Sequence, residues 1–338
     1  MITDALPKVS IIVPVYNAGE HLRPCMDTLI NQTLREIEIV CVLDCPTDGS
    51  DAIVEEYAAK DERIVVVRNK QNLNIGESRN VGLCVACGEY IGFSDHDDTR
   101  ELDMYEKLYE ATDNQSKAVV FSGKIVSVIH ENCVSSFLHQ EISEREFPIY
   151  QRAFLSFLPR VGRKFEGRGH ITPNLYQRSF LNEHKLKFVD SNKCYGEDIL
   201  FNMDLLSYVQ SDSEIGLIQH DYYKYLLHGE NTHLASWFSD GPHVVQHVHT
   251  MSDIISRVPY GKEITNQLIF IILICLIYTW FRRNIRSNGF NNTIRLLKEI
   301  INSDLVCLEI INKTPMPRYG FSLPKRLFAL WMKQMFYT

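Results

Sequence analysis

The chain lacks an apolar run long enough to cross a membrane. Its longest run covers 14 residues, 268–281, whereas a helix needs about 20 apolar residues to span a bilayer. The first residues also lack the charged segment followed by an apolar segment that marks an export signal. The expectation is a cytoplasmic protein in which residues 268–281 form a buried or interfacial helix.

The cysteines do not have the pattern of a disulfide framework or a zinc site. Nine of them are scattered along the chain, mostly inside apolar runs, which is typical of free buried thiols in a reducing compartment. Cys84 and Cys87 form a C-x-x-C motif, but the chain has no second such pair that would complete a zinc site. We expect neither a redox nor a zinc role for this motif.

Positive charge is scarce in the body of the chain and concentrated at its end. The formal net charge is -7. From Arg282 onward there are ten Lys or Arg against three Asp or Glu, which leaves -14 on the first 281 residues. An acidic body excludes nucleic acid as an expected partner, because the phosphate backbone attracts cationic surfaces. A basic tail beside apolar residues instead suits an anionic membrane surface.

Strand and helix patterns alternate through the first third of the chain. Strands are predicted at 9–14, 37–43, 64–68 and 89–93, and helices at 20–31, 51–60, 77–87 and 102–112. This alternation is typical of a mostly parallel sheet covered by helices. From residue 119 the patterns are shorter and mixed. Strands are predicted at 119–121, 124–129, 215–219 and 222–225, and helices at 175–184, 197–208, 243–259 and 265–286.

An acidic cluster follows the strand that ends at Phe93. Asp95, Asp97 and Asp98 lie within four positions, with His96 between them. Carboxylates are the ligands that Mg²⁺ and Mn²⁺ prefer, and substrate phosphates usually complete the shell. The alternative is a solvated turn in which Asp98 caps the next helix. The cluster's place after a buried strand favours the metal site, because open α/β sheets bind ligands there.

Two other strand ends offer a second set of polar side chains. The first strand leads into Pro14, Tyr16 and Asn17, and the second ends at Asp44. A carboxylate there could accept a hydrogen bond from a base or a ribose hydroxyl, beside an aromatic face. Asn17 and Asp44 are also good turn formers, and each residue taken singly favours the turn interpretation.

Five segments together resemble a known family. They are Val9–Asn17 (VSIIVPVYN), Glu38–Ser50 (EIVCVLDCPTDGS), Asn74–Gly82 (NIGESRNVG), Gly88–Asp98 (GEYIGFSDHDD) and Gly196–Phe201 (GEDILF). In order and spacing they resemble the family 2 glycosyltransferases of the GT-A fold, over roughly residues 7–235. The resemblance implies an α/β fold with a Rossmann-like mixed central sheet, flanking helices and a C-terminal helical extension. It divides the chain into a nucleotide-binding half, 1–100, an acceptor half, 101–235, and a basic helical extension, 236–338.

The resemblance also implies roles on the donor side of the site. Asp44 would read the nucleobase, usually uridine, in a pocket shared with Pro14, Tyr16 and Asn17. Asp97 would bind the Mn²⁺ or Mg²⁺ ion that bridges the diphosphate, Asp98 would be a second metal contact, and Asp95 would contact the ribose or sugar. Arg79 carries a donor fork suited to phosphate, although an ion pair with Glu77 or Asp95 is the alternative.

The resemblance makes Asp198 the catalytic base, with Glu197 beside it. An inverting transfer needs a carboxylate that takes the proton of the acceptor hydroxyl, and a helix N-terminus stabilises its ionised form. Without the other motifs, helix capping would be the favoured explanation of this Glu-Asp pair; with them, the catalytic role is favoured. Phe201 is expected to pack beneath the site.

Other candidates rest on weaker patterns. His228 resembles a position near the diphosphate or a further metal ligand, and an imidazole suits Mn²⁺ better than Mg²⁺. A lone loop histidine is more often without such a role. Arg168, His170 and Asn174 are candidates to face the acceptor.

One segment departs from the family pattern. Leu43, Asp44, Cys45 and Pro46 stand where family members commonly have Asp-Asp-Gly-Ser. One carboxylate and one glycine are therefore missing, which leaves the nucleotide preference open. His96, inside the acidic cluster, is expected to point away from the metal.

The combined prediction is a metal-dependent inverting glycosyltransferase that uses a nucleotide-sugar donor, most simply a UDP-sugar. Its acceptor would be a glycan or lipid-linked saccharide in surface polysaccharide synthesis. Basic and aromatic residues near the C-terminus predict association with the cytoplasmic face of the inner membrane; the alternatives are that their apolar faces complete the core or form a homodimer contact. They are Trp280, Phe281, Arg282, Arg283, Lys325, Arg326, Phe328, Trp331, Lys333 and Phe336.

Two other functions are weighed against this one. A sugar-phosphate nucleotidyltransferase would carry a glycine-rich, basic phosphate loop after the first strand, but this chain has the acidic segment 17–20 there. A non-catalytic sugar-nucleotide binder would not need both the metal carboxylates and a candidate base.

Overall fold

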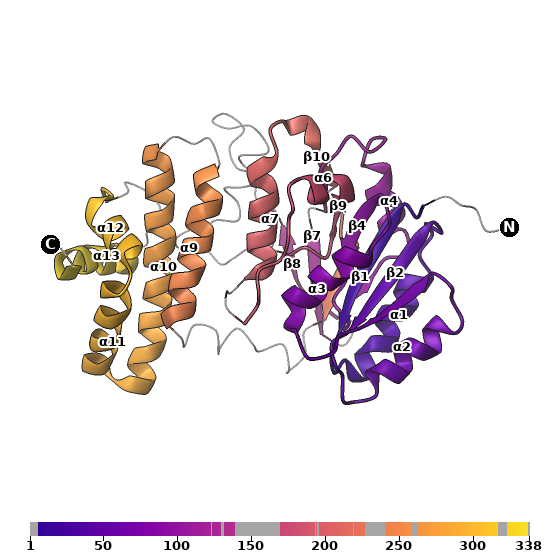
Figure 1. The fold of residues 1–338 in the computed structure, drawn as a ribbon, viewed down its shortest axis with the longest axis horizontal. Coiled ribbons are helices and arrows are strands. Elements are labelled where there is room, and N and C mark those ends of the chain that lie inside the picture. The colour runs from indigo at the N-terminus through magenta and orange to yellow at the C-terminus, as the bar shows by residue number, and fades with distance from the viewer. Residues whose placement is uncertain are drawn as a thin grey trace. The chain divides into compact units, whose positions relative to one another are not determined.

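The computed structural model describes residues 6–122, 124–129, 132–138, 170–192, 194, 196–218, 220–226, 241–257, 262–316 and 323–336. They form two compact units. The sheet unit holds the strands β1 to β11 and the helices α1 to α7, and the helical unit holds α9 to α13 (Figure 1).

A seven-stranded mixed sheet forms the centre of the sheet unit. Its order is β10-β6-β9-β4-β1-β2-β3. The strands are β1 (Val9–Val15), β2 (Ile37–Leu43), β3 (Ile64–Arg68), β4 (Tyr90–Phe93), β6 (Val119–Ser122), β9 (Asn174–Gln177) and β10 (Ile215–Ile218). Neighbours from β4 to β3 pair in parallel, whereas β9 is antiparallel to both β4 and β6. The predicted parallel core is therefore confirmed, and β9 makes the sheet mixed.

A smaller sheet lies beside the acidic cluster. Its order is β5 (Thr99–Arg100), β11 (Tyr223–Leu226), β7 (Lys124–Ile129) and β8 (Asn132–Leu138). β5 pairs with β11 in antiparallel fashion, with Arg100 opposite Tyr223. Because β5 directly follows Asp98, this pairing brings β11 to the cluster from more than a hundred residues away.

Helices cover both faces of the central sheet. They are α1 (Leu22–Ile30), α2 (Ser50–Ala58), α3 (Asn74–Val85), α4 (Met104–Glu110), α6 (Arg178–Glu183) and α7 (Glu197–Tyr208). Figure 1 shows α1, α2 and α4 on one side of the sheet and α3 and α7 on the other. Alternate residues of β1, such as Ile11 and Val13, share a buried core with α1, α2 and α4. On the other face, a Cβ at Gly82 of α3 would lie 2.4 Å from Ile12 Cγ2, so glycine allows this helix to approach the sheet.

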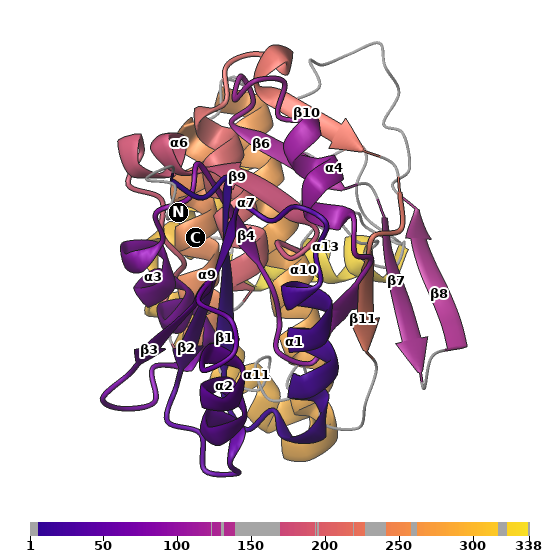
Figure 2. The same ribbon diagram turned by 90° about the vertical axis from the view of Figure 1, so that its right-hand side faces the viewer.

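The helix predicted at 175–184 is wrong in its first half. Residues 174–177 form β9, and only Arg178–Glu183 are helical, as α6. Leu175 and Tyr176 are fully buried, and β9 pairs with a strand on each side (Figure 2). A short apolar run does not distinguish a buried strand from a helix, and here the vacant position between β4 and β6 decides it.

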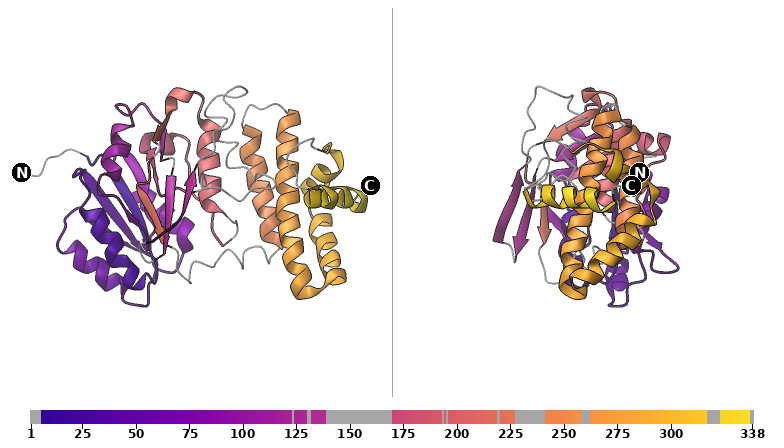
Figure 3. Two further views of the ribbon diagram at one scale, coloured as in Figure 1. Left: turned by 180° about the vertical axis from the view of Figure 1, so that it is seen from behind. Right: turned by 90° about the vertical axis from the view of Figure 1, so that its left-hand side faces the viewer.

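The helical unit contains five helices in its described residues. They are α9 (Gly241–Arg257), α10 (Lys262–Asn288), α11 (Phe290–Asn302), α12 (Leu305–Lys313) and α13 (Leu323–Phe336). Within this unit, α9 and α11 lie along α10 and α13 runs across it (Figure 3). Residues of the 268–281 run, including Phe270, Leu273 and Ile277, form its core with Leu297 and Ile311. For most residues of this run whose side chains the structure describes, the predicted burial is confirmed.

None of the described helices combines the length and apolar character that crossing a bilayer requires. The predicted domain boundary at residue 235 falls between the end of β11 and the start of α9, outside the described residues.

Candidate active site

The acidic cluster lies at the carboxyl end of β4, at the edge of the sheet where β1 also ends. The backbone N–H of Ser94 donates to the carbonyl of Ile12 at 3.0 Å, which fixes the start of the cluster against β1. The Asp95 side chain is 22% exposed, and Asp97 is partly exposed. His96 Nδ1 lies 3.1 Å from the carbonyl oxygen of Pro14, so its ring is held against the end of β1.

Asp98 has a different environment from its neighbours. It is fully buried, and its two carboxylate oxygens accept hydrogen bonds from the Tyr223 hydroxyl at 2.7 Å and the Leu226 N–H at 2.8 Å. Burial, together with the charges of Asp97 and Asp95, raises the pKa of Asp98 well above its usual range. Asp98 therefore anchors β11, and the metal contact predicted for it has no exposed surface in this structure.

Arg79 of α3 is the centre of a buried charge cluster. The side chain is 1% exposed, and its Nη2 donates to Asp95 at 2.9 Å. Its Nη1 donates to Asp198 at 2.5 Å and to Glu197 at 3.1 Å. Burial lowers the pKa of Arg79, but the three carboxylates outweigh this effect and raise it, so the guanidinium stays charged. The Arg79 guanidinium, which was predicted to bind phosphate, binds three carboxylates in this structure, including the alternative partner Asp95.

Glu197 and Asp198 open α7 as predicted, but they differ in exposure. The Asp198 side chain is 24% exposed and that of Glu197 only 8%. Burial raises the pKa of Asp198 well above its usual range, and Arg79 opposes this effect. Asp198 is therefore the more accessible carboxylate of the two.

An aromatic layer supports this charge cluster. Phe201 of α7 stacks on Phe188 with ring centroids 4.1 Å apart, and it also contacts Phe93 and Tyr176. The Arg79 guanidinium lies over the Phe188 ring at 5.3 Å. The predicted packing of Phe201 beneath the site is consistent with these contacts.

Asp44 organises a loop. It is 3% exposed, and it accepts hydrogen bonds from the Asn69 side chain and the Leu73 N–H on one oxygen and from the Asn74 N–H on the other. These bonds hold residues 69–74, which lead into α3. The next residue, Cys45, has a φ of +58°, a conformation that favours the glycine common at this position in the resembled family.

The residues after β1 shape the neighbouring strand end. Asn17 has a φ of +45°, and its side-chain oxygen accepts a hydrogen bond from the Thr47 N–H at 2.8 Å. This is the turn role that the sequence left open for it. Tyr16 is 46% exposed and presents an open ring beside it.

The acceptor-side candidates fall into two groups. His170 lies close enough to Asp95 and Arg79 for both to influence its pKa, which burial lowers, and its ring lies 5.8 Å from that of Tyr225. Asn174 is 2% exposed, and its amide donates to the His170 carbonyl and the Tyr176 hydroxyl. Asn174 thus supports His170 and has almost no exposed surface for an acceptor. Arg168 and His228 lie outside the described residues.

Sequence reasoning missed Tyr223 and Phe188. The Tyr223 hydroxyl accepts a hydrogen bond from the Asp95 N–H and donates one to Asp98, and Phe188 lies under Arg79. Both contacts cross about a hundred residues of sequence. A tyrosine in a short strand and a phenylalanine in a loop carry no motif that would have revealed them.

Comparison with known proteins finds similar glycosyltransferases. A family model described as glycosyl transferase family 2 matches residues 10–159. The putative glycosyltransferase EpsH of Bacillus subtilis is 26% identical over 93% of this chain and 87% of its own length. Residues 10–159 of the chain are thus similar to glycosyltransferase family 2. A second relative, the poly(ribitol-phosphate) beta-glucosyltransferase of Bacillus spizizenii, is 29% identical over 68% of this chain and 33% of its own length.

Solved structures show the same fold. The crystal structure of residues 1–349 of S. aureus TarS in complex with UDP-GlcNAc gives a TM-score of 0.66 at 20% identity. That comparison covers 98% of this chain and 89% of the other. In a longer crystal structure of TarS, with a TM-score of 0.64, the match covers 97% of this chain and 53% of the TarS chain. The predicted GT-A fold is confirmed. The family match and the named relatives favour a glycosyltransferase over the nucleotidyltransferase and non-catalytic alternatives.

Proposed function

We propose that this enzyme is an inverting glycosyltransferase that moves a sugar from a UDP-sugar to a hydroxyl of a glycan or lipid-linked saccharide in bacterial surface polysaccharide synthesis. The observation that carries the proposal is the Arg79 cluster, which joins Asp95, on the donor side, to Asp198, on the acceptor side. The UDP-GlcNAc and UDP complexes of TarS support the donor class. The name of a B. subtilis relative, the putative teichuronic acid biosynthesis glycosyltransferase TuaG, supports the acceptor class.

A divalent cation fits the donor side. Asp97 and Asp95 offer partly exposed carboxylates after β4, which is the oxygen donor set that Mg²⁺ and Mn²⁺ prefer. A structural neighbour, a mannosyltransferase from Pyrobaculum calidifontis, is known with GDP-Man and Mn²⁺. Asp97 would hold the ion, and His228 remains the predicted further ligand. The bound ion would neutralise charge on the leaving diphosphate. Asp98 would hold β11 in place beside it.

The nucleoside would lie at the ends of β1 and β2. Asp44 has three hydrogen bonds to the 69–74 loop, which leaves one lone-pair position on its second oxygen for a base N–H. The exposed Tyr16 ring would supply an aromatic face, and Pro14 and Asn17 would form the wall of the pocket.

Asp198 would act on the incoming acceptor. The acceptor hydroxyl oxygen would form a bond to the anomeric carbon from the face opposite the diphosphate, and the bond from that carbon to the diphosphate would break. Asp198 would take the hydroxyl proton. Burial favours this role because it raises the pKa of the carboxyl and makes its ionised form a stronger base. His170 and Arg168 would contact the acceptor, and Asn174 would hold His170 in place.

Replacing Asp97 with Ala tests the metal assignment. Loss of this ligand should weaken Mn²⁺-dependent UDP binding by at least about 10- to 100-fold, because even partners of metal ligands contribute that much to affinity. Isothermal titration calorimetry with UDP, with and without Mn²⁺, measures the effect. Asp113→Ala, at a carboxylate that is 72% exposed, is the matched control. Undiminished affinity in the Asp97 variant would exclude Asp97 as the ligand.

We further propose that the helical unit binds an anionic membrane surface peripherally. Leu327 and Leu330 of α13 are 58% and 48% exposed, and Phe290 is 56% exposed. The Phe281 ring links Phe290 to Trp331, with centroids 6.2 and 5.4 Å away. Exposed basic residues, Arg282, Arg283 and Arg326, lie on the same helices. Apolar side chains beside cations suit a helix at the surface of an anionic bilayer.

Vesicle co-sedimentation tests the membrane proposal. The chain should bind vesicles that contain anionic phospholipid and not neutral ones, and Leu327→Gln with Leu330→Gln should weaken binding by about tenfold or more, because each leucine loses part of its burial energy. Leu217→Gln in β10, where the leucine is 59% exposed, is the control. Equal binding to neutral vesicles would contradict the proposal. A dimer that the α13 variant dissociates would instead assign this surface to a second copy of the chain.

A further inference from the structure

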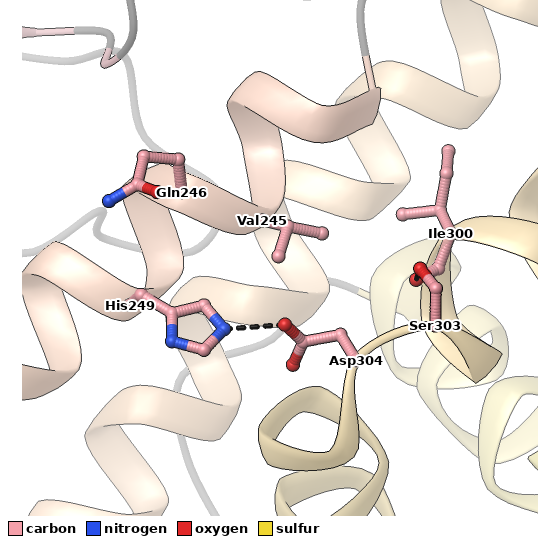
Figure 4. A pocket seen from close by; sticks show the side chains of 6 residues that line it. All are labelled: Val245, Gln246, His249, Ile300, Ser303 and Asp304. Atoms are coloured by element: carbon pink, nitrogen blue, oxygen red, sulfur yellow. Dashed lines mark hydrogen bonds and ion pairs between the residues drawn. The ribbon is translucent and has the colours of Figure 1, made fainter.

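The helical unit contains a polar pocket that glycosyl transfer does not explain. Its volume is about 350 Å³. It is lined by Val245, Gln246 and His249 of α9, Ile300 of α11, and Ser303 and Asp304 of the link to α12 (Figure 4). Val245 and Ile300 form an apolar side, and His249 and Asp304 point toward one another across the pocket (Figure 4).

Three side chains of metal-ligand type lie together here, and two of them, His249 and Asp304, line the pocket. His249 Nε2 lies 2.5 Å from Asp304 Oδ2. Cys307, three residues after Asp304, adds a thiol, and the potential ligand atoms of the three residues all lie within 4.8 Å of one another. Together the three side chains offer one nitrogen, one oxygen and one sulfur atom.

Helix capping explains only part of this arrangement. Asp304 is the N-cap of α12, and its Oδ1 accepts a hydrogen bond from the Cys307 N–H at 2.7 Å. This cap leaves Oδ2 for His249. A cation could therefore bind Oδ2 and the imidazole without breaking the cap. The His249 side chain is 37% exposed and that of Asp304 is 15% exposed, so an ion could reach them from the pocket.

We propose that His249, Asp304 and Cys307 bind a thiophilic divalent cation of the Zn²⁺ class. Zn²⁺ takes N, O and S ligands in tetrahedral geometry, and a site with three protein ligands keeps a fourth position for water. Metal bonds of about 2.0 to 2.3 Å require neighbouring ligand atoms to lie roughly 3.3 to 3.7 Å apart. The His249 and Asp304 atoms would separate slightly and the Cys307 sulfur would move inward.

Metal binding here also has a defined proton balance and a structural effect. The Cys307 thiol would lose its proton to solvent as the sulfur–metal bond forms. The proton between His249 Nε2 and Asp304 Oδ2 would also leave, to solvent from an imidazolium or with a proton taken up at Nδ1 in a neutral ring, and two bonds to the ion would replace this contact. The ion would join α9 to α12, which are 55 residues apart at this contact. This site differs from the one proposed at Asp97, which offers oxygen ligands only, and it does not depend on the glycosyltransferase proposal.

Cobalt titration of the full chain tests the proposal. With excess Mg²⁺ present to occupy oxygen-only sites, Co²⁺ should give a thiolate-to-cobalt charge-transfer band and the visible bands of a tetrahedral ion, and Zn²⁺ should displace it. His249→Gln should weaken binding by at least about 100-fold, since it removes a direct ligand. Cys307→Ser should abolish the charge-transfer band. Gln246→Ala, which changes the same pocket without removing a ligand, should bind Co²⁺ as the wild-type chain does.

Three results would overturn the proposal. One is a wild-type Co²⁺ spectrum without a thiolate band. The second is a band that persists in Cys307→Ser, which would assign it to another cysteine, such as the exposed Cys84. The third is equal Co²⁺ affinity in the wild-type and His249→Gln chains. Because His249 is partly exposed, this variant should fold even where a substitution at the buried Cys307 does not.

Discussion

Asp198→Asn is expected to reduce the rate of glycosyl transfer by about 10²- to 10⁴-fold, the contribution typical of a general base. The amide has nearly the same shape as the carboxylate but does not take a proton from the acceptor hydroxyl. Arg79 retains Asp95 and Glu197 as partners in this variant, so the fold and the binding of the donor should be preserved. Steady-state kinetics should show a lower kcat with an unchanged donor KM.

Glu197→Gln is the matched control for this prediction. Glu197 contacts the same Arg79 nitrogen as Asp198, but its side chain is three times less exposed, at 8% against 24%. The Glu197→Gln variant should therefore retain most of the transfer activity. An unchanged rate in Asp198→Asn would remove this residue as the base, and a larger loss in Glu197→Gln would exchange the two roles.

The pH profile gives a second readout of the same base. A base acts in its ionised form, so kcat/KM should rise with pH through the pKa of Asp198. Burial raises this pKa, so the rise should occur above the range of an ordinary aspartate. The Asp198→Asn variant should lose this part of the profile. A wild-type profile that is flat down to the usual aspartate range would contradict the assignment.

The sequence predicted the sheet because its strands carry a local signal. β1, β2 and β3 are mostly apolar runs between turn-forming residues. Such runs are typical of strands buried on both faces, and β1 and β2 are buried along their whole length. β9 carries no such signal. Its four residues become a strand because β4 and β6 leave a position between them, and this position arises only when the whole sheet is assembled.

The candidate site was predictable by residue type but not by contact. The motifs single out Asp95, Arg79 and Asp198, yet they say nothing of the pairing between them, because Arg79 and Asp198 are 119 residues apart. Local polar residues were also ambiguous. Asn17 and Asp44 carry the turn and loop contacts that their residue types allow, and only the structure shows which atoms these contacts occupy.

Arg79→Met is expected to lower the free energy of unfolding by about 3 to 5 kcal/mol and to abolish most of the transfer activity. Removing one member of a buried ion cluster leaves the remaining charges without compensation, which has a cost of this size. Here Asp95, Glu197 and Asp198 would be left facing one another. Chemical denaturation measures the stability. Arg23→Met, which breaks an exposed ion pair with Glu56, is the control and should change stability little.

Two further measurements separate this account from a simple packing defect. Without Arg79, the pKa of Asp198 should rise further, because Arg79 is the group that opposes the effect of burial. A carboxyl with a raised pKa holds its proton in the folded state and loses it when unfolded, so stability falls as pH rises. The loss in free energy of unfolding that Arg79→Met causes should therefore be smaller at acidic pH. Arg79→Lys keeps the positive charge but loses the forked donor geometry of the guanidinium. This variant should therefore be more stable than Arg79→Met and still transfer the sugar slowly. A loss in free energy of unfolding that does not vary with pH would assign Arg79 a packing role alone.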